Sequence, residues 1–248
     1  MPTTTPEFIT PDWHAPPTVH GACSTRRGGV SEAGFASLNL ASHVEDDLER
    51  VEQNRRILAQ ALNLPAQPEW LTQTHSIDVI DVAHTRNRNG DAALTRRPGQ
   101  VLAVLTADCL PVLFCNRQGS EIAAAHAGWR GLLGGILEQT VAAMQSDNEQ
   151  IMAWLGPAIG PAHFEVGAEV REAFIRHDAQ AASAFVQNRP GHYLADLYQL
   201  ARQRLKRQGV GAISGGEHCS FSDSARFYSY RREAKTGRMA SLIWMDSV

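Results

Sequence analysis

The sequence contains little cysteine, and its cysteines are not arranged for disulfide bonding. The four residues, Cys23, Cys109, Cys115 and Cys219, form no CxxC pair. Four thiols are too few for a disulfide scaffold in a chain of 248 residues, which is long enough to bury a stabilising core without one. We therefore expect reduced thiols and a cytoplasmic location.

Long hydrophobic runs are also missing. No stretch reaches the roughly 20 apolar residues that a membrane-spanning helix requires. The N-terminal lead-in, residues 1–18, is polar and rich in proline, and it lacks the apolar segment of a secretion signal. We expect the lead-in to be poorly structured, and we expect no membrane partner.

No charge of one sign dominates the sequence. The formal net charge is -3 at pH 7. Arginines pair locally at 26–27, 96–97 and 231–232, but no long basic stripe is present. Isolated arginine pairs are typical of solvated surfaces. The sequence therefore argues against nucleic acid as a partner and favours a small-molecule substrate.

Neither an internal repeat nor a low-complexity linker divides the chain, so we expect residues 1–248 to form a single domain. The polar segment 86–98 lies between two core-like segments and is interpreted as a surface loop. Strand and helix patterns interleave without the regular alternation of a doubly wound fold. This interleaving predicts a mixed α/β (α+β) domain.

Apolar periodicity indicates where several elements lie. Asp46 or Asp47 is expected to cap a helix that continues to about Leu62. Further helices are predicted over 131–144, 169–177 and 194–208. Buried strands are predicted over 101–106, 111–115, 121–126, 151–155 and 239–244.

Three segments place a chemically capable residue at the expected end of an element. His75 precedes the apolar alternation 77–82, Cys109 lies just before Pro111, and His126 precedes the turn Gly128-Trp129-Arg130-Gly131. Proline denies a sheet hydrogen bond, and glycine allows a tight turn. Loops held at strand ends are where functional sites are commonly built.

Imidazole and thiolate are good ligands for zinc, and also for copper. Two histidines and one cysteine leave one position of a tetrahedral metal open, which is the catalytic pattern. A water molecule there would have its pKa lowered to about 7. The spacing does not decide the matter, because 34 residues from His75 to Cys109 and 17 from Cys109 to His126 match no short zinc-binding pattern. A buried cysteine and two hydrogen-bonded core histidines remain the alternative.

Distinctive motifs run almost from end to end of the chain, at 24–31, 37–40, 73–76, 106–112, 125–131, 156–161, 227–232 and 236–240. In these motifs the chain resembles the laccase-domain family, which is also called the multicopper polyphenol oxidase family and includes purine nucleoside phosphorylase and peptidoglycan editing factor proteins. One departure is Ala41-Ser42, where a glycine more often follows the Asn-Leu pair. The resemblance implies layered mixed β-sheets flanked by helices, a zinc-dependent site, and His75, Cys109 and His126 as metal ligands.

Four further residues are candidates around this site. Asp108 can orient a ligand or move a proton, and it can equally stabilise a turn. Arg26 and Arg130 can bind an anion such as phosphate, or form structural salt bridges. Asn39 can hydrogen-bond a substrate or form a turn.

Two other groups of residues have less direct interpretations. Tyr228, Tyr230, Arg231 and Arg232 alternate as if on a strand, with both tyrosines on one face. Cys23, Cys219 and His218 are a weak candidate for a second site, because no other ligand-type residue converges on them in the sequence.

The resemblance implies phosphorolysis of purine nucleosides (adenosine, inosine, guanosine and methylthioadenosine) and deamination of adenosine. Peptidoglycan-precursor editing by an amidase that uses the same Cys/His site is a second hypothesis, with Cys109 as nucleophile and a histidine as base. A third is a non-catalytic metal- or nucleoside-binding module.

Oxidation of phenols by copper is the fourth hypothesis. A multicopper cluster requires many histidines in close HxH pairs, and the sequence has no HxH. The copper-dependent polyphenol oxidase is therefore the less favoured reading of the family name.

Overall fold

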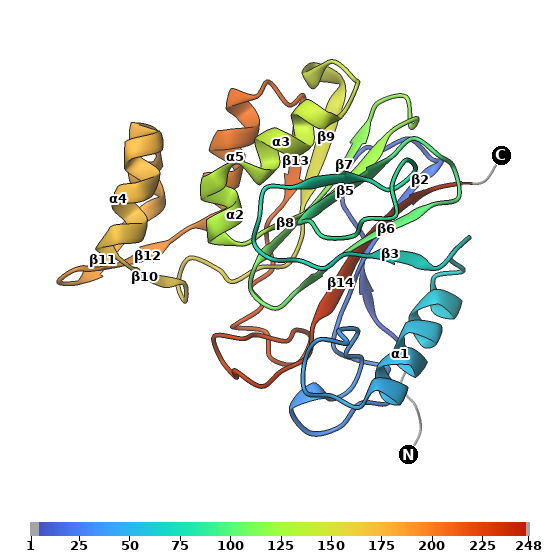
Figure 1. Ribbon diagram of the computed structural model, residues 1–248. Helices are drawn as coiled ribbons and strands as arrows, with labels where there is room; N and C mark the ends of the chain where they lie inside the picture. Colours follow the sequence, from blue (N-terminus) through green and yellow to red (C-terminus); the bar gives the residue numbers. More distant parts are fainter. Residues whose placement is uncertain (1–4, 247–248) are drawn as a thin grey trace.

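Two β-sheets packed face to face form the centre of the computed structural model, which describes residues 5–246 (Figure 1). The five-stranded sheet has the order β1 (Phe8–Ile9), β2 (Val19–Ser24), β14 (Met239–Met245), β6 (Val101–Thr106) and β3 (Pro68–Trp70). The six-stranded sheet has the order β13 (Ala212–Gly215), β9 (Ile151–Leu155), β7 (Leu110–Asn116), β8 (Ile122–Ala127), β5 (Ala92–Thr95) and β4 (Val79–Asp81). Parallel pairing occurs only at the edges of these two sheets, so both are mixed.

The alternation of side chains along β6 shows how the layers are separated. Leu102 and Val104 enter the core between the two sheets, whereas Val101, Ala103 and Leu105 enter the core on the opposite side. Successive residues of a strand point to opposite faces, so a continuous apolar run serves two cores at once.

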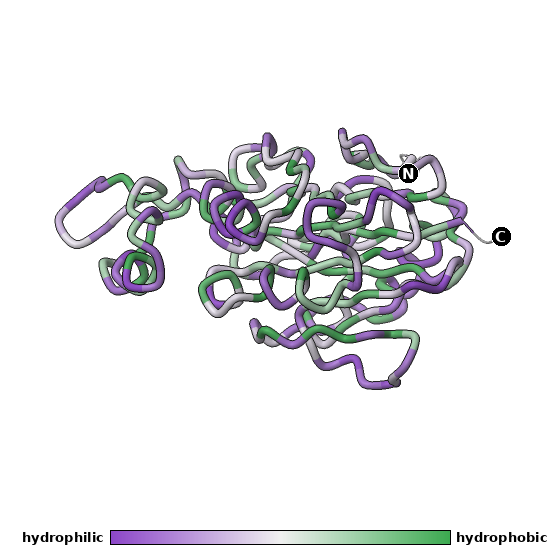
Figure 2. Tube along the Cα trace, turned by 90° about the horizontal axis from the view of Figure 1, so that it is seen from above, coloured by the Kyte–Doolittle hydropathy of each residue, from purple (hydrophilic) through white to green (hydrophobic). Residues whose placement is uncertain are grey.

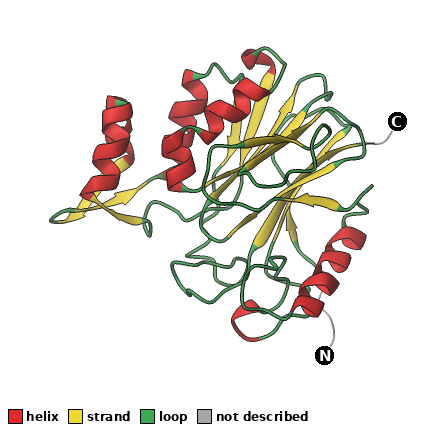
Figure 3. Cartoon of the chain, in the orientation of Figure 1, coloured by secondary structure: helices red, strands yellow, loops and turns green. Residues whose placement is uncertain are grey.

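Helices cover the outer faces of both sheets (Figure 3). α1 (Leu48–Ala61) packs on the five-stranded sheet, and Leu58 lies in its core. The six-stranded sheet is covered by α2 (Trp129–Gly134), α3 (Ile136–Ala143) and α5 (Leu197–Arg207). The predicted layered arrangement of mixed sheets flanked by helices is therefore confirmed.

A smaller antiparallel unit extends to one side of these layers (Figure 1). It consists of β10 (Glu165–Gly167), β12 (His192–Ala195) and β11 (Phe185–Arg189) with α4 (Ala168–His177). Short 3-10 helices lie at η1 (Ala33–Phe35), η2 (Asn148–Gln150) and η3 (Ala179–Ala184). Viewed from above, the apolar segments concentrate in the stacked strands of the main body (Figure 2).

Most of the predicted elements are confirmed. Asp47 caps α1, and its carboxylate accepts hydrogen bonds from the backbone N–H groups of Glu49 and Arg50. The strands predicted from apolar runs correspond to β6, β7, β8, β9 and β14, and the helix predicted over 169–177 corresponds to α4. The apolar runs predict these strands correctly because strands inside a layered core are apolar on both faces.

Two helix predictions are wrong in their extent. The helix predicted over 131–144 is divided into α2 and α3, because Gly135 adopts a left-handed conformation with φ 104° and ends the first helix. The helix predicted over 194–208 begins only at Leu197, after the cap Asp196. Leu194 instead pairs in the sheet as part of β12.

Two loop and strand predictions are also wrong. Segment 86–98 is not entirely a surface loop, because Ala92–Thr95 form the buried strand β5. Residues 228–232 form no strand, and the two tyrosines do not share an environment: Tyr228 is fully buried while Tyr230 is 56% exposed. Side-chain hydrogen bonds, including that of Tyr228 to the carbonyl of Phe35, hold this segment in place of a sheet ladder.

The N-terminal lead-in carries some regular structure in its described part. Phe8–Ile9 pair with β2 at Ser24 and Cys23, while residues 1–4 lie outside the described residues. Between residues 5 and 246, no helix has the length and apolar character needed to cross a membrane.

Candidate metal centre

His75, Cys109 and His126 come together from three segments of the chain. These are the loop between β3 and β4, the connection between β6 and β7, and the strand β8. His126 lies on β8, on the same side of the strand as Ile122 and Ala124, which face the core between the sheets. Cys109 lies where the chain leaves β6 in one sheet and enters β7 in the other. The register of β7 and β8 sets Pro111 opposite His126, so Cys109 lies close to that histidine.

The donor atoms of the three side chains fit a single metal ion. All lie within 4.8 Å of one another, and Cys109 Sγ is 3.8 Å from His75 Nε2. A tetrahedral zinc ion with its usual bond lengths would separate sulfur and nitrogen ligands by about 3.6 Å. The rings of His75 and His126 meet edge to face at 4.9 Å. The group can therefore hold a metal ion with little movement.

Asp91, at the start of β5, organises two of the three ligands. Its carboxylate is fully buried and lies 2.7 Å from His126 Nδ1. The same carboxylate accepts backbone hydrogen bonds from Thr74, His75 and Ser76 at 3.0, 3.0 and 2.7 Å. With Nδ1 bound to Asp91, His126 presents Nε2 to the metal position, an arrangement that fixes the tautomer of a metal-binding histidine.

Unusual backbone conformations shape the two loops that carry ligands. His75 has φ 61° and Asp108 has φ 90°, both in the left-handed region that non-glycine residues seldom adopt. Four hydrogen bonds from residues 74–76 to the Asp91 carboxylate help to fix the first loop. Gln73 helps as well, because its amide both donates to and accepts from the backbone of Leu105.

Gly128 lies against the metal position. A Cβ atom at residue 128 would lie 2.7 Å from His75 Cδ2 and 3.0 Å from Cys109 Sγ. Real Cβ atoms do not approach neighbours so closely, so the absence of a side chain leaves room for the ligands.

Burial and charge act in opposite directions on the Cys109–His126 pair. Burial alone would raise the pKa of Cys109, but the charge and hydrogen bond of His126, with help from His75, lower it overall. Burial alone would lower the pKa of His126, but Cys109 and Asp91 raise it. Without a metal the pair is therefore a thiolate and an imidazolium at neutral pH.

Asp91 stays ionised for similar reasons. Burial would raise the pKa of its carboxyl, but the hydrogen bond and charge of His126 and the N–H groups of Ser76 and Thr74 outweigh burial and lower it. Cys23 and Cys115 differ, since burial raises the pKa of each thiol to about 12.

A cavity of about 590 Å³ opens from the three ligands. Two of the residues predicted near the site, Asp108 and Arg130, also line this cavity. Aromatic residues and two further arginines complete the lining. The complete lining is His43, Gln73, His75, Leu105, Thr106, Ala107, Asp108, Cys109, His126, Trp129, Arg130, Ile159, Phe164, Tyr230, Arg231 and Arg238. The cavity is thus polar at the ligands, aromatic on its walls and positively charged.

Asp108 uses both carboxylate oxygens to hold the loop that follows β13. One accepts from the Ser220 hydroxyl at 2.6 Å, and the other accepts from the backbone N–H of Arg231 at 2.7 Å. These contacts are those of a turn-stabilising aspartate. A role in proton transfer stays a prediction.

Arg26 and Asn39 are not among the residues that line the cavity. The guanidinium of Arg26 donates to the carbonyls of Ala36 and Ser224 and lies over the ring of Tyr228. Asn39 is fully buried and accepts a hydrogen bond from the backbone N–H of Arg238. Their substrate-binding role stays a prediction.

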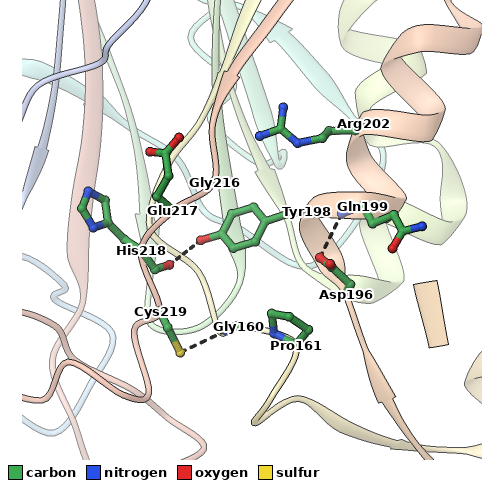
Figure 4. A pocket seen from close by; sticks show the side chains of 10 residues that line it. All are labelled: Gly160, Pro161, Asp196, Tyr198, Gln199, Arg202, Gly216, Glu217, His218 and Cys219. Carbon is green, nitrogen blue, oxygen red and sulfur yellow. Dashed lines mark hydrogen bonds between the residues drawn. The ribbon is translucent and has the colours of Figure 1, made fainter. Parts of the chain in front are cut away.

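The three residues of the weak candidate for a second site, Cys23, Cys219 and His218, do not line one cavity in the structure. Cys219 and His218 line a separate hollow of about 360 Å³ beside Tyr198 and Gly160 (Figure 4). In this hollow, Cys219 Sγ accepts a hydrogen bond from the backbone N–H of Gly160, and the Tyr198 hydroxyl donates to the carbonyl of His218. Cys23 lies elsewhere, buried in β2 between the sheets.

Sequence reasoning missed Asp91 and Arg238. Asp91 lies in the segment 86–98 that is interpreted as a surface loop from the sequence. The sequence feature that could have indicated its role is an acidic residue directly before the apolar run of β5. Arg238 precedes the last apolar run in the same way. An isolated charge at the start of a buried strand was the available clue to both.

Replacing Asp91 with asparagine is expected to weaken metal binding by about 10-fold to 100-fold, because His126 loses the partner that fixes its orientation. Competition with a chromophoric chelator measures the affinity. Asp78→Asn is the matched control, since Asp78 lies nearby with an exposed side chain. Unchanged affinity in folded Asp91→Asn protein would contradict the role given to Asp91.

Gly128→Ala is expected to abolish stoichiometric metal binding, because the added Cβ would lie against His75 and Cys109. The protein should still fold, because the backbone of Gly128 has φ -60° and ψ 157°, which alanine tolerates. Metal content by elemental analysis and the thermal unfolding midpoint are the two measurements. The control is Gly134→Ala in the same helix, whose Cβ would meet only the Ile77 side chain. Full metal content in the Gly128 variant would refute the steric argument.

The lowered pKa of Cys109 predicts its alkylation behaviour in the metal-free protein. A thiol with a lowered pKa keeps its thiolate as the pH falls, so iodoacetamide should modify Cys109 quickly at pH 7, where an ordinary thiol of pKa about 8.5 is largely protonated. Mass spectrometry gives the rate at each cysteine from pH 6 to 9. His126→Ala should raise the pH at which the alkylation rate of Cys109 is half-maximal. An ordinary half-maximal pH for Cys109 in the unchanged protein would contradict the proposed ion pair.

The chain is similar to known proteins along almost its whole length. Residues 20–246 match the family described as multi-copper polyphenol oxidoreductase laccase. The chain is 53% identical to the protein named purine nucleoside phosphorylase YfiH of Escherichia coli, over 96% of this chain and 99% of that one. It is 52% identical to the Pseudomonas aeruginosa protein named purine nucleoside phosphorylase PA4543, over 96% and 98% of the two chains.

The fold matches a solved structure equally well. The crystal structure of Neisseria meningitidis protein NMB0706 superposes with a TM-score of 0.93 at 49% identity, covering 97% of this chain and 99% of that chain. The resemblance found in the sequence motifs is confirmed along almost the whole chain. The protein belongs to the multi-copper polyphenol oxidoreductase laccase family.

Proposed function

We propose that this protein is a zinc-dependent purine nucleoside phosphorylase that also deaminates adenosine. The observation that carries the proposal is the His75, Cys109 and His126 donor set, which opens into a cavity of about 590 Å³. Relatives about half identical to this chain bear the name purine nucleoside phosphorylase. Adenosine, inosine, guanosine and methylthioadenosine are the proposed nucleosides.

The cavity walls suit a nucleoside. Trp129, Phe164 and Tyr230 supply aromatic surface, against which a purine can stack. Arg130 stands beside Trp129, with its guanidinium 4.2 Å from the ring centroid. Its charge can attract an anionic co-substrate to the entrance of the cavity.

The three ligands and Asp91 provide the chemical end of the cavity. Two histidines and a thiolate suit zinc, and a zinc ion held by them would supply Lewis acidity at this end of the cavity. Asp91 keeps the Nε2 atom of His126 directed at the metal, and Cys109 and His75 complete the set. Asp108 is the candidate acid for the departing ammonia in deamination, once a substrate has altered its contacts with Ser220 and Arg231.

The activity is tested with zinc-loaded protein, adenosine and inorganic phosphate. We expect adenine and ribose-1-phosphate from phosphorolysis and inosine from deamination, resolved by liquid chromatography. Cys109→Ala should lose both activities because it removes the thiolate ligand. Product formation no higher than in this variant would refute the proposed function.

A second candidate function is amide hydrolysis in peptidoglycan-precursor editing, with Cys109 as the nucleophile. The observation that favours it is the line of Asp91, His126 and Cys109, in which a carboxylate orients a histidine that activates a thiolate. A chelator separates the two mechanisms. Activity that is lost with the chelator and restored by zinc supports the metal site, and activity that persists supports the cysteine nucleophile.

Copper-dependent oxidation of phenols is less well supported. In residues 5–246, the only group of three or more His, Cys, Asp or Glu side chains placed to hold a metal is His75, Cys109 and His126. A single three-ligand group suits a mononuclear centre, whereas a multicopper cluster requires many more histidines. The same three donors also suit one copper ion.

A further inference from the structure

Arg238 occupies a defined position at the metal end of the cavity. It directly precedes β14, and the register of that strand sets Met239 opposite Thr106 at the end of β6. The chain continues from Thr106 through Ala107 and Asp108 to the ligand Cys109. Arg238 and Cys109 therefore line the same cavity from adjacent strand ends.

The backbone around Arg238 is held tightly. Its N–H donates to Asn39 Oδ1 at 3.0 Å, and Asn39 Nδ2 donates to Asp46 at 2.8 Å. Any side chain at Gly237 would collide, since a Cβ there would lie 2.7 Å from Tyr228 Cζ. The buried Asn39 thus contributes to the site indirectly, by fixing the arginine that lines the cavity.

The guanidinium of Arg238 is half-buried and has no carboxylate partner. Its Nη1 donates to the carbonyls of Thr236 and Gly237 at 2.8 and 3.0 Å. Within residues 5–246, Nε and Nη2 have no hydrogen-bond acceptor, and no salt bridge reaches this side chain. Burial lowers the pKa of Arg238, while the charges of Cys109 and Asp108 oppose that effect, and arginine remains charged at neutral pH.

The two free donors of Arg238 are not sealed from solvent, so both can reach an anion that enters the cavity. The other two arginines of the cavity differ, because both are exposed. Arg130 stacks on Trp129, and Arg231 donates to the carbonyl of Glu165. Arg238 is the half-buried one, and the charge of the ligand Cys109 acts on its guanidinium.

His43 adds a second donor to this part of the cavity. It lines the cavity with Arg238, and its pKa is lowered first by burial and then by the charges of Arg238 and Arg55. At neutral pH it is uncharged, so its ring can donate one hydrogen bond without adding repulsion. A planar guanidinium fork beside a neutral N–H donor suits a tetrahedral oxyanion.

We propose that Arg238, assisted by His43, binds the inorganic phosphate that attacks the nucleoside, an inference that rests on the proposed phosphorylase function. In the reaction a phosphate oxygen forms a bond to C1′ as the bond between C1′ and the purine nitrogen breaks. The bonding electron pair leaves with the purine, and the proton of hydrogen phosphate passes to that nitrogen. The products are ribose-1-phosphate and the free base.

The test compares Arg238→Met and Arg238→Lys with the unchanged enzyme, all loaded with zinc. We expect Arg238→Met to raise the KM for phosphate by about 10-fold to 100-fold and to change the KM for inosine by less than about 2-fold. Arg238→Lys should fall between, since lysine keeps the charge but loses the fork. Arg207→Met is the control for the lost charge, because Arg207 lies in the last turn of α5 and does not line the cavity.

Adenosine deamination provides a readout that does not use phosphate. If Arg238 binds phosphate, the methionine variant retains deamination while it loses phosphorolysis at low phosphate. An equal loss of both reactions, or an unchanged KM for phosphate, would overturn the inference while the proposed function stands.

Calorimetric titration of inorganic phosphate into the zinc-loaded protein measures phosphate binding independently of phosphorylase activity. Binding that depends on Arg238, in a protein without phosphorylase activity, would support the anion site and refute the proposed function. Equal binding by the unchanged protein and Arg238→Met would overturn the anion site.

Discussion

The buried carboxylate of Asp91 is the interaction on which the metal centre depends. It holds His126 through Nδ1 and the backbone of residues 74–76 through three N–H groups, so one side chain sets two ligands from separate parts of the chain. Breaking a buried pair of this kind by removing one partner typically costs about 3–5 kcal/mol. The left-handed conformation of His75 therefore persists because Asp91 compensates for it.

The layered architecture determines where these groups can meet. β6 belongs to one sheet and β7 to the other, so Cys109 lies on the crossing between them. His126 comes from the neighbouring strand β8, and Arg238 comes from the start of β14, which pairs with β6. The site thus forms at a shared end of two packed sheets, where strand ends from both layers converge while the core behind them stays apolar.

Charge is distributed unevenly around this junction. A thiolate, a buried carboxylate and two imidazoles surround the metal position, and three arginines line the cavity in front of it. A metal cation held by the three ligands would take the place of the proton on His126, and an anion would pair with the guanidinium of Arg238. The cavity is consequently suited to a substrate pair that is aromatic in one part and negatively charged in another.

Composition and periodicity by themselves determined the class of fold, the buried strands, the cap of α1 and the candidate ligands, because apolar runs and breakers act locally. They left the metal site open, since ligands 34 and 17 residues apart are joined only by strand register and by the crossing between sheets. Only the tertiary structure identified Asp91, divided the helix at Gly135, and showed that Asn39 holds the backbone of Arg238. These features depend on partners distant in sequence, which a local pattern does not encode.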